Sequence, residues 1–169
     1  METERVREKE PSAKKTDTYE TVFGFFAERR KLAKEGKVVI KGKELPWEQA
    51  RQGLLKFYVL PMVGEAAYKN TLVFIHDIRH HSGKHRHQGG LVIYVIEGKG
   101  YTTVDGQRVD WEAGDLILLP IKPRGIEHQH FNRDQGKPCK WLAFVFQSFS
   151  DAMGNEFEQK EVSPDWKGA

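Results

Sequence analysis

The segment over residues 71–149 constrains the fold most, because it alternates short apolar runs with turn residues. The runs are rich in valine, isoleucine and aromatic residues, which favour β-strands. Residues 101–104 and 107–111 flank Asp105-Gly106, a pair typical of a two-residue hairpin turn. Strands of this length, joined by glycine, proline and aspartate turns, predict an antiparallel sandwich or barrel.

One helix is expected ahead of these strands, over residues 17–36. Its apolar side chains recur at the spacing of one helical face, at Tyr19, Val22, Phe23 and Phe26. Asp17 is a residue type that caps a helix start, and Gly36 is a stop signal. We expect this aromatic face to pack on the outside of the barrel or on a second subunit.

The remaining chain divides around one barrel. Residues 1–16 are nearly all polar or charged, which predicts a disordered charged arm. The barrel is expected over residues 37–150, and residues 151–169 form a polar C-terminal tail that packs on its surface. Besides the hairpin, strands are expected at 38–40, 55–59, 71–78, 90–96, 116–120, 127–132 and 141–149, with a turn or short helix at 45–48.

Composition narrows the classes of function. The chain has 169 residues and a net charge of +3 spread along the sequence, so nucleic acid is not an expected partner. No stretch approaches the roughly 20 apolar residues of a membrane span, and the N-terminus does not resemble a signal peptide. The single cysteine, Cys139, fits a reducing compartment. We therefore expect a cytoplasmic protein without membrane or nucleic-acid partners.

Three histidines carry the strongest chemical signal in the sequence. His85 and His87 are two residues apart on an expected strand, so both side chains point to the same face. His128 lies on a later strand that can fold back beside the first. Three imidazoles on one concave face are suited to a divalent transition metal. We take His85, His87 and His128 as the candidate metal ligands.

The spacing around these histidines resembles the two sequence motifs of the cupin family. The first motif, His-x-His followed by a glycine, matches Gly83, His85, His87 and Gly98. The second motif matches, after a three-residue insertion, Gly114, Pro120, Pro123, Gly125, His128 and Asn132. The hairpin between the motifs has the length expected of the family. The resemblance implies an all-β fold, the cupin double-stranded β-helix or jelly-roll barrel, here with an N-terminal α-helix.

Two positions depart from the family pattern. Leu91 stands where the family has a ligating glutamate, and Arg79 stands where it has a glycine. A three-histidine site without the glutamate is similar to that of gentisate dioxygenase and related ring-cleaving cupins. Those enzymes are usually chains of about twice this length with two cupin units. The resemblance therefore implies the barrel and a metal site, and it leaves the substrate open.

The chemistry of such a site follows from its charge. Three neutral imidazoles leave about three positions open on an octahedral ion and do not neutralise its positive charge. A bidentate anion such as a catecholate, a salicylate-type hydroxy acid or an enolate would fit there, together with O2 if the ion is Fe(II). The resemblance favours Fe(II), while Mn(II), Ni(II), Cu(II) and Zn(II) accept the same ligands.

Other residues are candidates for substrate contacts. His130 is expected on the same face of its strand as His128, where it can orient a substrate or transfer a proton. Arg124, Arg79 and Arg86 are candidates for holding a carboxylate, and we place Arg124 with His130 among the catalytic candidates. Candidates with weaker signals are His76, His80, His81, Gln88, Tyr94, Tyr101 and Trp141.

Three functions are compatible with these residues. The first is a metal-dependent dioxygenase-type enzyme that acts on a small aromatic or otherwise bidentate anionic substrate. The alternatives are a non-catalytic cupin that binds a small ligand or has a regulatory role, and a metal-dependent lyase or isomerase. By analogy with the family, we expect a homodimer that forms through sheet edges and the aromatic helix.

Overall fold

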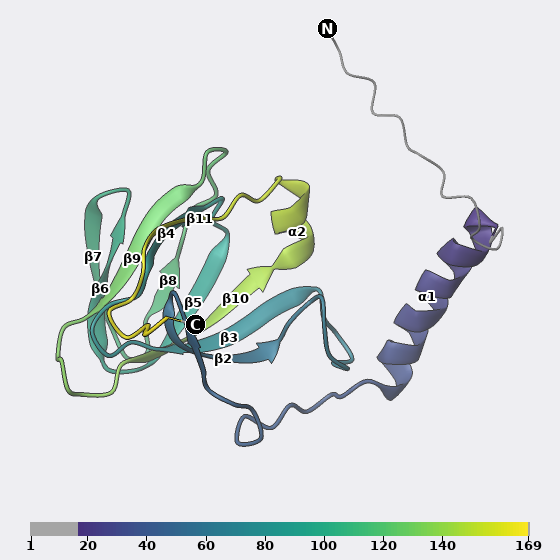
Figure 1. The fold of residues 1–169 in the computed structure, drawn as a ribbon, viewed down its shortest axis with the longest axis horizontal. Coiled ribbons are helices and arrows are strands. Elements are labelled where there is room, and N and C mark those ends of the chain that lie inside the picture. Colours follow the sequence, from purple (N-terminus) through teal and green to yellow (C-terminus); the bar gives the residue numbers. More distant parts are fainter. Residues whose placement is uncertain (1–16, 169) are drawn as a thin grey trace, which may run out of the picture.

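The computed structural model describes residues 17–168, which form two antiparallel sheets facing each other and one helix that stands apart from them (Figure 1). The strands of the first sheet are β1 Glu48–Ala50, β2 Gly53–Val59, β3 Thr71–Asp77, β5 Leu91–Glu97, β8 Leu116–Leu118 and β10 Lys140–Phe146. Those of the second are β4 Lys84–His87, β6 Lys99–Val104, β7 Gln107–Glu112, β9 Ile126–Asn132 and β11 Glu158–Glu161. Their orders are β1-β2-β3-β10-β5-β8 and β11-β4-β9-β6-β7. The predicted all-β jelly-roll barrel with an N-terminal helix is confirmed.

Alternation along the strands builds the core between the two sheets. In β5 the side chains of Leu91, Ile93 and Val95 are buried, and those between them are exposed. The other sheet contributes Ile126 from β9, which is fully buried. Because side chains on a strand point alternately to its two faces, the apolar residues of β5 fill the interior from one side and leave an apolar outer face on the other.

The hairpin of β6 and β7 forms as the sequence predicts. Val104 pairs with Gln107, so Asp105 and Gly106 are the two turn residues. Both have positive φ angles, 49° and 83°, as a turn of type I′ requires. This hairpin places β6 next to β9, the strand that carries two of the histidines.

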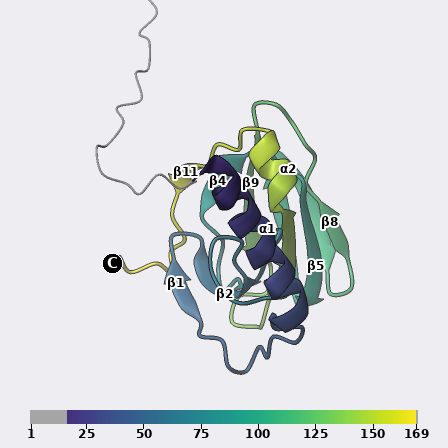
Figure 2. The same ribbon diagram turned by 90° about the vertical axis from the view of Figure 1, so that its right-hand side faces the viewer.

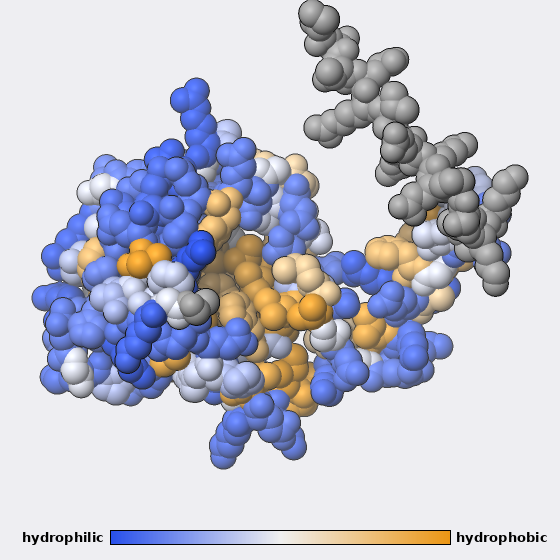
Figure 3. Space-filling model, in the orientation of Figure 1, coloured by the Kyte–Doolittle hydropathy of each residue, from blue (hydrophilic) through white to orange (hydrophobic). Residues whose placement is uncertain are grey.

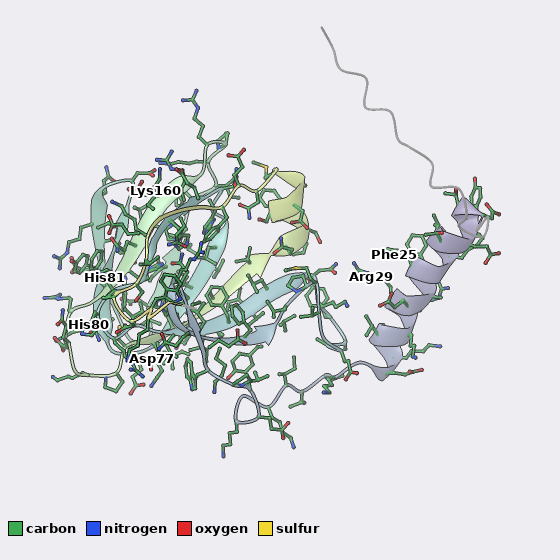
Figure 4. All side chains as sticks on the ribbon, in the orientation of Figure 1. Phe25, Arg29, Asp77, His80, His81 and Lys160 are labelled. Atoms are coloured by element: carbon green, nitrogen blue, oxygen red, sulfur yellow. The ribbon has the colours of Figure 1, made fainter. Side chains whose placement is uncertain are left out.

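The helix α1 spans Thr18–Glu35 and begins at Asp17, whose side chain accepts a hydrogen bond from the Tyr19 backbone N–H at 3.2 Å. No residue of α1 is buried, and the helix stands in front of the barrel when the view is turned (Figure 2). Its Arg29 lies beside Phe25 (Figure 4), 5.1 Å from the ring centroid. Arg29 also donates a hydrogen bond to the Asn70 side chain. The aromatic face therefore does not pack on its own barrel. Neither described helix is long and apolar enough to cross a membrane.

Several segment boundaries differ from the expectations. Residues 38–40 form no strand, because Val38 and Val39 find no partner strand and are 87% and 74% exposed. The segment near residue 48 is the short strand β1 and not a helix. The strand expected over residues 141–149 is β10, which ends at Phe146 because α2 (Gln147–Ala152) begins there. The polar tail then adds β11 to the second sheet, and the predicted arm, residues 1–16, lies outside the described residues.

Candidate metal centre

Two adjacent strands carry the three histidines predicted to bind a metal. His85 and His87 lie on β4, and His128 lies on β9 directly opposite His85 in the register. The His128 ring centroid is 4.2 Å from that of His85 and 4.7 Å from that of His87. The turn before β9 needs Gly125, which has a φ of +72° and would place a Cβ 2.7 Å from the carbonyl oxygen of His87.

The donor atoms of these rings fit a metal ion. One nitrogen from each ring can be chosen so that all three lie within 4.8 Å of one another. The Nδ1 atoms of His85 and His128 lie 3.4 Å from the carbonyl oxygens of Gly83 and Ile126, which favours a proton on Nδ1 and a free lone pair on Nε2. His128 Nε2 is buried and has no hydrogen-bond partner among residues 17–168. A bound ion would satisfy this atom.

His87 has a different hydrogen-bond partner. The backbone N–H of Gly89 donates to His87 Nδ1 at 3.1 Å, so the proton of the neutral ring is on Nε2. A histidine bound to a metal through Nε2 carries its proton on Nδ1, and one bound through Nδ1 has no lone pair left there. Metal binding through either nitrogen of His87 therefore breaks the hydrogen bond from Gly89.

Burial keeps the candidate ligands neutral. Loss of solvation lowers the pKa of His85 and of His87 to about 4, and for His85 the nearby His87 adds to the effect. The pKa of His128 is also lowered well below its usual value, first by burial and then by the neighbouring histidines. Neutral imidazoles have the lone pair that a transition metal needs, so at pH 7 these rings need not lose a proton before they bind an ion.

The histidines border a cavity of about 230 Å³ between the two sheets. Its apolar wall is formed by Leu55, Phe57, Leu72, Phe74, Leu91, Trp141, Val145 and Phe157. Its polar residues besides histidine are Gln52, Ser82, Gln147, Ser150 and Asn155. Figure 3 shows apolar residues gathered around the hollow in the middle of the face in view. Among residues 17–168, no aspartate, glutamate, lysine or arginine lines this cavity.

His130 also lines the cavity and is 2% exposed. Its Nδ1 lies 2.8 Å from the Thr102 hydroxyl, which also accepts a hydrogen bond from the Trp111 indole. The predicted shared face of His128 and His130 is confirmed, since both are buried and both reach the cavity. His76, from the opposite sheet, completes the histidines of the wall, and its ring centroid is 4.9 Å from that of Trp141.

Several candidates lie outside this cavity. Arg79 and Arg124 are exposed, and Arg86 pairs with Glu127 at 3.7 Å on the outer face of β4. The catalytic role of Arg124 therefore stays a prediction that its position does not support. His80 and His81 lie on the edge of the barrel near Asp77 (Figure 4), where they contact Asp165 and Gln129.

The aromatic candidates divide between the two sides of the sheets. Trp141 lines the cavity. Tyr94 is 44% exposed on the outer face of β5, and Tyr101 stacks on Phe131 with ring centroids 4.5 Å apart. Side chains alternate between the two faces of a strand, but which face points inward is known only once the register is known. The sequence alone therefore did not show that Trp141 points into the cavity while Tyr94 and Tyr101 do not.

Sequence patterns missed the part of the wall contributed by the C-terminal tail. Phe157 stacks on the His85 ring, with centroids 4.9 Å apart and ring planes at 24°. Asn155 lines the same cavity. The available signal was weak, because Phe157 is a lone aromatic residue within a polar segment.

Comparisons with known proteins agree with this architecture. Residues 75–145 match the family described as "Cupin domain". A gentisate 1,2-dioxygenase of a Ralstonia species is 44% identical over 59 residues, which are 34% of this chain and 16% of that protein. One from a Streptomyces species is 41% identical over 59 residues, 34% of this chain and 15% of that protein. The chain thus matches only a short part of these relatives.

Solved structures resemble the barrel at low sequence identity. A mutant of the salicylate 1,2-dioxygenase of Pseudoaminobacter salicylatoxidans, in complex with gentisate, has a TM-score of 0.53 at 20% identity. The similarity covers 96% of this chain and 54% of that one. A mutant of the Streptomyces nucleoside dehydratase Pac13, with uridine, has a TM-score of 0.52 at 16% identity, and the similarity covers 75% of this chain and 94% of that one. At these identities the likeness concerns the fold. The matched residues, the two-sheet barrel and the paired motifs together show that this chain contains a cupin domain.

Proposed function

We propose that this chain is a metal-dependent enzyme of the dioxygenase type, with Fe(II) held by His85, His87 and His128. The observation that carries the proposal is three neutral histidines at the wall of an apolar cavity, with no acidic side chain from residues 17–168 lining it. The local sequence likeness to gentisate dioxygenases supports it. When bound, such an ion supplies positive charge and open coordination positions for two reactants.

The cavity wall favours a particular kind of substrate. Since no lysine or arginine among the described residues lines it, the only strong positive charge available to a bound anion is that of the metal. A substrate with a second carboxylate far from the metal would lose its hydration without gaining a partner. Phe57 and Phe74, whose centroids are 5.7 Å apart, offer apolar ring surfaces instead. We therefore propose a small aromatic or enolic molecule with one chelating anionic group.

His130 is proposed as the residue that orients the substrate. Its ring lies beside His128, with centroids 5.5 Å apart. His130 is not one of the three histidines whose nitrogens lie close enough to bind one ion. Thr102 engages Nδ1, which leaves Nε2 to hold a proton or to contact a ligand. Because the ring is buried and its orientation is held by Thr102, it can position a substrate without large entropy loss.

Metal content is the first test of this proposal. Wild type, His128→Ala and His80→Ala, a control histidine outside the cavity, are purified without chelators and measured by elemental mass spectrometry. We expect near-stoichiometric metal in wild type and His80→Ala, and loss of metal in His128→Ala. After anaerobic loading with Fe(II), oxygen uptake is measured with gentisate, salicylate, catechol and acetylacetone. Uptake that requires His128 would support the dioxygenase.

The alternatives give different results in the same experiment. A ligand that raises the melting temperature without turnover would favour a binding or regulatory cupin. Turnover without oxygen consumption would favour a lyase or isomerase. A wild-type chain that binds no metal even after loading would refute the three-histidine centre.

We propose that a second copy of this chain covers the apolar outer face of the six-stranded sheet. Leu116 and Leu118 on β8 are 56% and 64% exposed there, and Phe146 on β10 is 53% exposed. Contiguous apolar surface of this kind is typical of an interface. The salicylate dioxygenase neighbour has a chain nearly twice as long, and a second copy would supply a second barrel.

A further inference from the structure

The C-terminal strap, which we define as residues 153–161, runs beside the candidate metal centre. It leaves α2 through Gly154, whose φ is +65°, and continues into β11. β11 pairs with β4, the strand of His85 and His87, and Gln159 lies opposite His85 in the register. The strap is therefore attached to the strand that carries two of the three proposed ligands.

Phe157 is the residue of the strap that meets these ligands. Its ring is nearly parallel to both ligand rings on β4, at 4.9 Å and 24° from His85 and at 6.2 Å and 10° from His87. The residue is nevertheless 58% exposed, so one side of the ring covers the histidines and another meets solvent. A phenyl ring in this position stabilises the barrel core little, because most of its surface stays in water. Its position suits it to control access to the histidines.

Gln88 holds this strap in place. The residue is 7% exposed, and both polar atoms of its side chain bind strap backbone. Its Oε1 accepts from the Glu156 N–H at 2.8 Å, and its Nε2 donates to the Gly154 carbonyl at 3.3 Å. Gln88 follows His87 directly, and the turn after it depends on Gly89, where a Cβ would lie 1.9 Å from the Pro120 carbonyl oxygen. The carboxamide therefore links the strap backbone to the residue that follows His87.

We infer that Phe157, held in position by Gln88, determines which ligands reach the three-histidine centre. The inference rests on the proposed metal site and adds a residue that sets its specificity. Phe157 covers one side of His85 and His87, so a ligand must approach alongside a flat ring. Gln88 holds the strap just before this ring, through its hydrogen bonds with Gly154 and Glu156. A planar chelator passes and stacks, whereas a chelator with bulky substituents meets the ring edge.

Ligand discrimination by the Co(II)-loaded protein tests this inference. Co(II) binding is followed by its visible absorption, and 4-nitrocatechol and 3,5-di-tert-butylcatechol are then titrated without oxygen. We expect the wild type to prefer the flat 4-nitrocatechol, and Phe157→Ala to reduce the ratio of the two affinities about tenfold, the size of a ring contact of ~1.4 kcal/mol. Gln88→Met, which keeps the length of the side chain and removes both hydrogen bonds, should reduce the ratio in the same direction.

The controls separate this inference from the metal site itself. Co(II) affinity should be unchanged in Phe157→Ala, because the ring contributes no ligand. Phe23→Ala, which removes a phenyl ring of similar exposure, 60%, from the distant α1, should leave the ratio unchanged. If Phe157→Ala binds Co(II) normally and still discriminates between the two catechols as the wild type does, the role of Phe157 is refuted and the metal site is not. Failure of the wild type to bind Co(II) would overturn both the metal site and this inference.

Discussion

The buried histidine of the opposite sheet, His76, predicts a specific dependence of stability on pH. His76 is 2% exposed, and its pKa is lowered to about 3, first by burial and then by the nearby His85, against a smaller raising effect of a hydrogen bond with the Gln52 backbone. The ring packs closely against the backbone of β2, since a Cβ on Gly53 would lie 2.6 Å from His76 Nε2. In the unfolded chain the same imidazole has an ordinary pKa near 6.5.

The sign and size of the effect follow from these two values. Above pH 6.5 the ring is neutral in both states and has no effect on the pH dependence. As the pH falls toward 3, the unfolded chain binds a proton that the folded chain does not, so the free energy of unfolding decreases. At pH 5 the loss from His76 alone is about 2 kcal/mol, from roughly 1.5 pH units at ~1.4 kcal/mol each. A domain of this kind has a total stability of only about 5–15 kcal/mol.

Urea denaturation of metal-free protein between pH 4.5 and 8 measures this effect. In His76→Gln we expect the slope of the free energy of unfolding against pH, below pH 6, to decrease by about 1.4 kcal/mol per pH unit, which corresponds to one proton. Leu55→Ala is the matched control, because Leu55 is buried opposite His76 in the register and carries no proton. It should lower stability at every pH and leave the slope unchanged. An unchanged slope in His76→Gln would refute the assignment of a neutral, buried imidazole.

Two further predictions concern the outer face of the sheet and the position of the missing glutamate. Analytical ultracentrifugation should show that the wild type is a dimer and that Leu118→Lys is a monomer. Val109→Lys, which changes an exposed residue of β7, should remain a dimer. A monomeric wild type would exclude the proposed pairing. Leu91 is 4% exposed at the cavity wall, so without metal Leu91→Glu should lower the melting temperature, because a buried carboxylate is costly. With Zn(II), the melting temperature of Leu91→Glu should rise more than that of Leu91→Gln, because only the carboxylate is a good ligand. Equal rises would place residue 91 out of reach of the ion.

Local patterns predicted the parts of the structure that local rules determine. The turn at Asp105-Gly106 needs positive φ angles that few residue pairs adopt, so its hairpin could be located from the sequence. The spacing of two between His85 and His87 places both rings on one face of any strand. The pairing of His128 with His85 depends on long-range register, and the family motifs supplied it.

Features that depend on distant packing were not accessible in this way. Residues 38–40 have β-branched side chains, yet no strand lies beside them, and their propensity alone does not make a sheet. The tail of the chain looked like a polar surface segment, because three of its four strand residues in β11 are exposed. Its hydrogen bonds with β4 are backbone contacts, which side-chain composition does not reveal.

All three proposed ligands lie on β4 and β9, so one sheet provides the metal ligands while the other sheet shapes the rest of the cavity. Phe57, Phe74 and His76, which face these histidines, come from strands of the other sheet. Substitutions on β2, β3 and β10 can therefore change the shape of the cavity without replacing a donor atom. A barrel built in this way can acquire new substrates by changes in one sheet while the other sheet preserves the metal centre.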